Sequence, residues 1–192
     1  MFEKAGWEPG LLPPRCRRYY EVGVELVVYN QRGRISPPAP VLVLIDGRLP
    51  PEVGRNPSDA VLKELLEASK TVAVVGLSPK PDRDSHQVAL YLKRQGYRVV
   101  PVYPREDFIL GERVFRTLGE IPFRVDIVDV FRRSEETLPV VEEAVRLRPR
   151  AVWLQLGVVN EAAVLLCEAA GVTLIMDRCI MVEHRRLCGG GS

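Results

Sequence analysis

The sequence predicts an α/β protein, a doubly wound parallel sheet in a Rossmann-like three-layer sandwich, with an irregular N-terminal extension. Three observations support this fold class. From Asn56 onward, short apolar runs alternate with segments of helical periodicity. The apolar runs are largely hydrophobic on both faces, which is typical of strands buried between two layers of helices. The spacing of the runs suits right-handed crossovers between parallel strands.

Five strands and five helices are expected in this region. Ser58, Ser134 and Asn160 have the residue types of helix N-caps, and Gly96 and Gly171 are expected to end helices in the left-handed conformation. The expected strands are 71–75, 97–103, 125–131, 151–156 and 172–176; the helices follow Ser58 and cover 85–95, 134–146, 160–171 and 179–186, with a turn-like segment at 104–115 and a short helical turn near Leu118.

Composition limits the classes of function. The 192 residues, 46% of them hydrophobic, suffice for one packed domain with an appendage. A net charge of +2 argues against a nucleic-acid-binding protein. The apolar run 41–45 is too short to span a bilayer, and the first residues do not have the pattern of a signal peptide. The four cysteines form no Cys-x-x-Cys pair, so we expect reduced thiols, no metal site and a cytoplasmic location.

Residues 1–55 differ from the rest and are assigned to the extension. They hold eight of the 16 prolines, although 19–30 and 41–46 have the composition of strands. A small β extension and a disordered leader both remain open, and we expect no chemistry from this part. The predicted domain covers 56–187, followed by a flexible tail over 188–192 that ends in Gly-Gly-Gly-Ser.

The loop after the first expected strand has the features of a phosphate-binding loop. In parallel sheets, ligands bind beyond the carboxyl ends of the strands. Gly76 has no Cβ and lets a phosphate approach the backbone, and a helix starting at Ser85 offers free N–H groups. Ser78 is better suited to hydrogen bonding than to nucleophilic attack, because the Gly-x-Ser-x-Gly motif is absent. The alternative is that Gly76 forms only a tight turn and Ser85 only an N-cap.

Arginines follow four of the five expected strands, among them Arg83, Arg105, Arg132 and Arg178. The second strand ends without the acidic residue that commonly binds the ribose of NAD. Arg105 at that end favours a ligand with an additional phosphate on the ribose, such as NADP or coenzyme A (CoA). The alternative is that Arg105 is a solvated loop charge.

No catalytic constellation is evident. His86 and His184 have no nucleophile and orienting acid at a recognisable spacing. Asp126 and Asp129 are three residues apart in a strand, so we expect them to face opposite sides rather than to form a carboxylate pair. Cys179 follows the last strand at a helix start; an inert packing role is favoured over a redox-active thiol.

Several segments together resemble the small bacterial and archaeal CoA-binding domain proteins, which are similar in turn to the CoA-binding Rossmann domain of the succinyl-CoA synthetase α subunit. These are the run from Asn56 to Pro104, then VDIVDVFRRSE, AVWLQLGVVNEAA and MDRCIMVEHRRL. The family commonly has Asn where this chain has Tyr103, so no contact is implied for that side chain. The resemblance implies CoA contacts from Gly76, Leu77, Ser78, Arg83, Ser85, Pro104, Arg105, Phe131, Arg132, Leu154, Gln155 and Leu156.

The expected function is therefore binding of CoA or acyl-CoA, with a small-molecule ligand and neither nucleic acid nor membrane as partner, by a monomer or homodimer. The likeness implies binding and not catalysis, because the synthetase's phosphorylated histidine lies in another domain. Enzyme activity is left undecided, with a binding role favoured. Two alternatives stay open: an NADP-type oxidoreductase or redox sensor, and the CoA-binding subunit of a split acyl-CoA synthetase.

Overall fold

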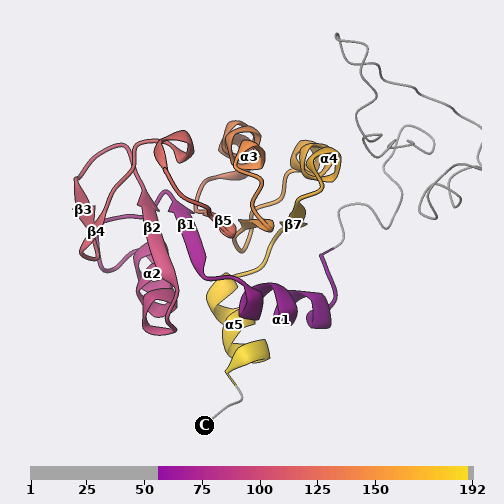
Figure 1. Cartoon of the computed structure of the whole chain (residues 1–192), viewed down its shortest axis with the longest axis horizontal. Helices are drawn as coiled ribbons and strands as arrows, with labels where there is room; N and C mark the ends of the chain where they lie inside the picture. Colours follow the sequence, from indigo (N-terminus) through magenta and orange to yellow (C-terminus); the bar gives the residue numbers. More distant parts are fainter. Residues whose placement is uncertain (1–55, 190–192) are drawn as a thin grey trace, which may run out of the picture. The chain divides into compact units, whose positions relative to one another are not determined.

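The structure, a computed structural model, describes residues 56–189 and contains a five-stranded parallel sheet with helices on both faces (Figure 1). The strand order is β2-β1-β5-β6-β7, which confirms the predicted doubly wound α/β fold. The predictions for residues 1–55 and for the last three residues of the tail lie outside the described residues. The strands are β1 (Thr71–Val75), β2 (Arg98–Val102), β5 (Ile127–Val130), β6 (Ala151–Leu154) and β7 (Thr173–Ile175).

Two layers of helices bury the sheet. One face carries α1 (Asp59–Ala68), α2 (Asp84–Arg94) and α5 (Ile180–Cys188), and the other carries α3 (Thr137–Arg146) and α4 (Glu161–Ala170) (Figure 1). The first face holds a core of fully buried side chains because the helices present apolar stripes to it. Its members include Leu62, Leu66, Val74, Leu92, Trp153 and Ile180. No helix of residues 56–189 is long and apolar enough to cross a membrane.

The strand order reverses direction at β1. This strand pairs with β2 on one side and with β5 on the other, so the chain leaves β1 in one direction and later returns to its opposite edge. The loops that leave the carboxyl ends of β1 and β5 therefore diverge to opposite faces. This topology opens a crevice at the carboxyl edge of the sheet, where ligands of such folds bind.

The helix ends only partly follow the predicted caps. Asn160 Oδ1 accepts from the Ala163 N–H at 3.1 Å, and Gly171 has φ +66°, as predicted. The prediction that Ser134 caps α3 is wrong: Ser134 begins a 3₁₀ turn, η3 (Ser134–Glu136), and its Oγ accepts instead from the Val159 N–H at 3.2 Å. Ser58 does occupy the N-cap position of α1, although its side chain makes no capping hydrogen bond.

A short hairpin replaces the turn-like segment expected between β2 and β5. Its strands are β3 (Phe108–Ile109) and β4 (Glu112–Arg113), and a left-handed pair between them, Leu110 at φ +54° and Gly111 at φ +76°, reverses the chain. The helical turn expected near Leu118 is the 3₁₀ helix η2 (Leu118–Glu120).

Candidate functional site

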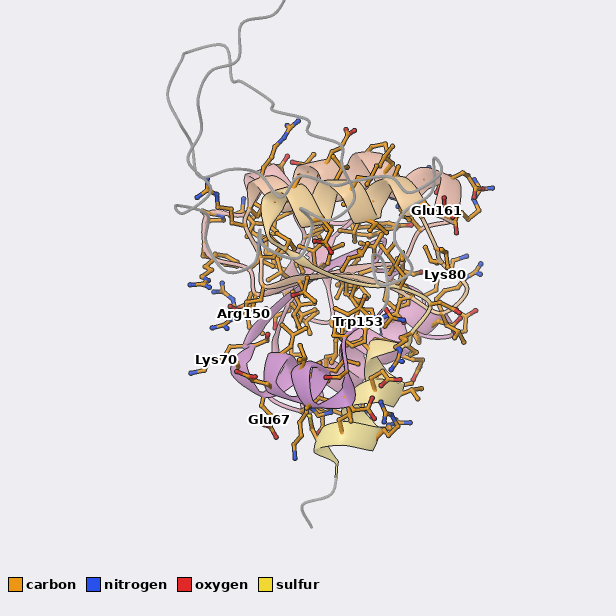
Figure 2. All side chains as sticks on the ribbon, turned by 90° about the vertical axis from the view of Figure 1, so that its right-hand side faces the viewer. Glu67, Lys70, Lys80, Arg150, Trp153 and Glu161 are labelled. Carbon is orange, nitrogen blue, oxygen red and sulfur yellow. The ribbon has the colours of Figure 1, made fainter. Side chains whose placement is uncertain are left out.

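An open pocket of about 430 Å³ lies at the carboxyl edge of the sheet, beside the reversal of strand order. The loop after β1, the first turn of α2 and the ends of β2 and β5 surround it. Figure 2 shows Lys80, from that loop, on the opposite side of the molecule from Lys70 and Arg150, which precede β1 and β6. The pocket is lined by Gly76, Ser78, Lys80, Arg83, Asp84, Ser85, Tyr103 and Phe131.

Gly76 allows the backbones of three strands to meet at the pocket. Its N–H donates to the Val102 carbonyl oxygen at 2.9 Å, and its φ is +84°, a conformation that favours glycine. A Cβ at this position would lie 2.4 Å from the Phe131 carbonyl oxygen. The pocket therefore requires glycine here for both space and conformation.

The loop from Ser78 to Lys80 is tied to the first turn of α2. The Ser78 N–H donates to Ser85 Oγ at 3.0 Å, and His86 Nδ1 donates to the Ser78 carbonyl oxygen at 3.0 Å. Ser85 is therefore not an N-cap; Arg83 occupies that position, without a side-chain capping bond. The N–H groups of Asp84 and Ser85 have no backbone acceptor in the described part of the chain, so they are available to an anion.

Positive charge around the pocket is only partly neutralised. No ion pair within residues 56–189 involves Lys80, Arg83, Arg105 or Arg132. Two other arginines that follow strands of the sheet form ion pairs. Arg133 lies 2.6 Å from Glu136, which raises the pKa of Arg133, and Arg178 lies 3.3 Å from Glu183. Asp84 also lines the pocket, and its negative charge opposes an anionic ligand.

Sequence comparison assigns the chain to a family. The model of the family described as "CoA binding domain" matches residues 70–185. This chain belongs to the CoA binding domain family. The uncharacterized protein YneT of Bacillus subtilis (strain 168) is 46% identical to it over 130 residues, which are 68% of this chain and 96% of that protein.

Solved structures share the fold of this CoA-binding domain. A Thermus thermophilus protein, cell-free ID.343, is 40% identical and superposes with a TM-score of 0.66, covering 68% of this chain and 99% of its own. A hypothetical protein from Pyrococcus horikoshii OT3 is 35% identical with a TM-score of 0.68, covering 74% and 99% of the two chains. The family resemblance predicted from the sequence is thereby confirmed.

The structure brings together five of the twelve residues predicted to contact CoA: Gly76, Ser78, Arg83, Ser85 and Phe131 line the pocket. The sequence had not indicated Lys80 or Asp84, which line it as well, and had left Tyr103 without an implied contact. Tyr103 directly follows β2, and its position at the end of a strand could have predicted that it lines the pocket.

The other seven predicted residues lie around the pocket or beneath it. Leu77 and Leu154 are fully buried in the core, so the structure presents neither residue at the surface. Pro104, Arg105 and Arg132 are exposed where β2 and β5 end. Beyond β6, Gln155 is buried and Leu156 is exposed. Contact of all twelve with CoA in this CoA-binding domain remains a prediction.

Sequence reasoning missed a buried polar pair beside the pocket. Gln155 Nε2 donates to Asp129 Oδ1 at 2.7 Å, and Asp129 is fully buried in β5. Burial raises the pKa of Asp129 to about 7, against the lowering effect of the Gln155 hydrogen bond. Asp126 makes separate contacts at the amino end of the sheet, accepting from the N–H groups of Lys70 and Thr71.

The histidines and Cys179 make structural contacts. His184 Nδ1 shares a hydrogen bond of 2.9 Å with the Tyr91 hydroxyl, and burial lowers the pKa of His184. Cys179 occupies the N-cap position of α5, as its predicted place at a helix start implied, and it is half-buried against the core. Within residues 56–189, no group of three or more His, Cys, Asp or Glu side chains is arranged to hold a metal ion.

Proposed function

We propose that this protein binds CoA or acyl-CoA reversibly, without catalysis of its own, and that the CoA phosphates lie against the loop and helix start formed by residues 76–85. The observation that carries the proposal is the combination at the pocket. Gly76 allows a close backbone approach, and within residues 56–189 the amides of Asp84 and Ser85 have no backbone acceptor and the cations Lys80 and Arg83 form no ion pair. Membership of the CoA binding domain family supports the identity of the ligand.

The physical properties of the pocket suit a phosphorylated ligand. A phosphate at the first turn of α2 would accept from backbone N–H groups and interact with the positive end of the helix dipole. Lys80 and Arg83 would add charge-assisted hydrogen bonds, which are stronger than neutral ones. The pocket is open and holds about 430 Å³, so it would enclose the phosphates and leave the rest of CoA across the ends of β5 and β6.

A binding role is favoured over catalysis by the contacts of the two histidines. His86 is held by the Ser78 carbonyl oxygen and His184 by the Tyr91 hydroxyl. General acid–base catalysis by either ring would disturb a hydrogen bond that supports the fold. Neither ring has a hydrogen bond to a serine hydroxyl or a cysteine thiol in the described part of the chain.

Native mass spectrometry of the purified full chain tests the proposal, followed by calorimetric titration with CoA, NADPH and NADH. We expect a bound species with the added mass of CoA, and tighter binding of CoA than of either nicotinamide nucleotide. Tighter binding of NADPH would overturn the proposal in favour of an oxidoreductase or redox sensor. Conversion of CoA, ATP and a carboxylic acid to acyl-CoA only after a second subunit is added would favour the split synthetase.

A further inference from the structure

Asp129 is a carboxyl group in the middle of the sheet. Its register neighbours are Val74 on β1 and Trp153 on β6, both fully buried on the face covered by α1, α2 and α5. Figure 2 shows Trp153 in the interior of the molecule. Asp129 Oδ2 is the one buried side-chain oxygen or nitrogen of residues 56–189 that has no hydrogen-bond partner. A buried carboxyl without full pairing costs free energy, so its retention calls for a functional explanation.

The side-chain partner of Asp129 reaches the surface. Gln155 donates from Nε2 to Asp129 Oδ1 at 2.7 Å and is 6% exposed. No described residue donates to Gln155 Oε1, and this oxygen is not among the buried atoms without a partner, so it is open to solvent. It lies at the carboxyl edge of the sheet, one strand from Phe131, which lines the pocket.

The ionised state of Asp129 fixes which atom Gln155 presents at the surface. An ionised carboxylate only accepts, so Gln155 must turn its NH₂ group inward and its carbonyl oxygen outward. A protonated carboxyl can donate to Oε1, and the amide then turns over and presents its NH₂ group. Ionised Asp129 thus fixes an acceptor at the surface, whereas protonated Asp129 allows both orientations of the amide.

We propose that Asp129 is a positioning residue for the ligand: in its ionised form it holds the Gln155 carbonyl oxygen outward, where it accepts a hydrogen bond from an amide N–H of the CoA pantetheine arm. This inference rests on the proposed CoA site and adds a specificity element to it. The phosphates would be bound at β1 and α2, and the amide-bearing arm would be recognised by a hydrogen bond at the end of β6.

The environment lets Asp129 change protonation near neutral pH. Complete burial raises the pKa of Asp129 to about 7. The nearest strand neighbours, Val74 and Trp153, carry no charge. No hydrogen bond or ion pair links Asp129 to a charged group among the described residues. None of the titratable side chains of the helices on that face forms a hydrogen bond or ion pair with Asp129, and Asp59 and Glu183 are paired to arginines. These side chains are Asp59, Lys63, Glu64 and Glu67 on α1, Asp84, His86, Tyr91, Lys93 and Arg94 on α2, Cys179 at the N-cap of α5, and Glu183, His184, Arg185, Arg186 and Cys188 on α5.

Calorimetric titration of the full chain between pH 6 and pH 8 tests this role. The wild type and Asp129→Asn are compared with two ligands: CoA, and adenosine 3′,5′-bisphosphate, which lacks the pantetheine arm. The readout is the ratio of the variant's Kd to the wild-type Kd, which cancels the titration of the ligand itself. For CoA, this ratio should rise about three- to tenfold from pH 6 to pH 8, within the limit for coupling to one proton. For the bisphosphate it should stay constant, and Asp126→Asn, a matched change at the opposite end of the sheet, should leave both ratios constant.

A ratio for CoA that is constant or falls with pH would overturn the inference, as would an equal rise for the bisphosphate. Absence of CoA binding to the wild type at every pH would overturn the proposed function and this inference with it, so the two failures are distinguishable. A second measurement does not depend on the variant folding: in the wild type without ligand, the NMR signals of the Gln155 side-chain NH₂ group should shift with a midpoint near pH 7. Signals that do not move between pH 5.5 and pH 8.5 would contradict the coupling.

Discussion

Asn56 and Met176 are separated by 120 residues and exchange two hydrogen bonds. Asn56 Nδ2 donates to the Met176 carbonyl oxygen, and the Met176 N–H donates to Asn56 Oδ1, both at 2.8 Å. The side-chain amide pairs with the backbone just beyond β7 as a neighbouring strand would. This pairing fixes the start of the described domain at the carboxyl end of the last strand.

We therefore expect a chain that begins at Asn56 to fold and to bind CoA, whereas Asn56→Ala should destabilise the protein. The loss of two hydrogen bonds to backbone groups corresponds to about 1–3 kcal/mol of unfolding free energy. Urea denaturation measures it, with Gln95→Ala as a control at an exposed position. Aggregation of the shortened chain would show that residues 1–55 belong to the fold and that the predicted boundary is wrong.

Replacement of Gly76 should affect both stability and binding. In Gly76→Ala, the new Cβ would meet the Phe131 carbonyl oxygen at 2.4 Å, in addition to the cost of φ +84°. Gly96→Ala is a matched control, because Gly96 has φ +90° with nothing within 4 Å of an added Cβ. We expect a loss of about 1 kcal/mol for Gly96→Ala, the conformational cost alone, and more for Gly76→Ala. Only Gly76→Ala should abolish CoA binding in calorimetry; equal behaviour of the two variants would contradict a special role for Gly76.

Much of the fold could be predicted because its signals are local. Apolar runs identified all five strands of the sheet, and the helix ends at Asn160, Gly96 and Gly171 follow from the backbone preferences of those residue types. The hairpin over 108–113 could not be predicted, since strands of two residues show no periodicity. The error at Ser134 has a tertiary cause: its hydroxyl accepts from the distant Val159 N–H, which no local pattern encodes.

The candidate site was predictable where it is built from one segment. The loop at 76–85 combines a glycine, two serines and basic residues within a short range, so the sequence could predict a site there, and residues of this loop do line the pocket. The pairing of Asp129 with Gln155 joins residues 26 positions apart and depends on the register of β5 and β6. A signal was present, because Asp129 interrupts an otherwise apolar strand, but its partner becomes evident only in the structure.

Stability should fall as the pH rises through the range in which Asp129 ionises. The folded-state pKa of about 7 lies above the ordinary value of 3.8 for an aspartate, so the folded protein retains a proton that the unfolded chain releases. Unfolding free energy should therefore decrease between about pH 4 and pH 7 and level off above, by a total on the order of 4 kcal/mol. In Asp129→Asn this decrease should be absent. Urea denaturation at a series of pH values measures it, and identical profiles for the two proteins would contradict a raised pKa.

The affinity for CoA should depend on the phosphate at the ribose 3′ position. Arg105 is exposed at the end of β2 and forms no ion pair with a described residue, so it is available to that phosphate. A charge-assisted contact contributes roughly 1.5–3 kcal/mol, so CoA should bind about ten- to a hundredfold more tightly than dephospho-CoA. In Arg105→Ala the two ligands should bind nearly equally. Calorimetry that finds the wild type unable to distinguish them would remove Arg105 from the site.

Asp84 provides the last prediction, because its carboxylate opposes the proposed ligand and supports the helix. It lines the pocket in the first turn of α2, where an acidic side chain is stabilised by the helix dipole by about 0.3–1 kcal/mol. A phosphate bound at the same turn would be repelled by it. Asp84→Asn should therefore lower the unfolding free energy slightly and strengthen CoA binding about three- to tenfold, equivalent to roughly 1 kcal/mol of charge repulsion. The gain should shrink at high salt, since the site is open to solvent. Asp82→Asn, a matched change in the same loop outside the pocket lining, should change affinity less. Weaker CoA binding by Asp84→Asn than by the wild type would show that the phosphates lie elsewhere on the rim.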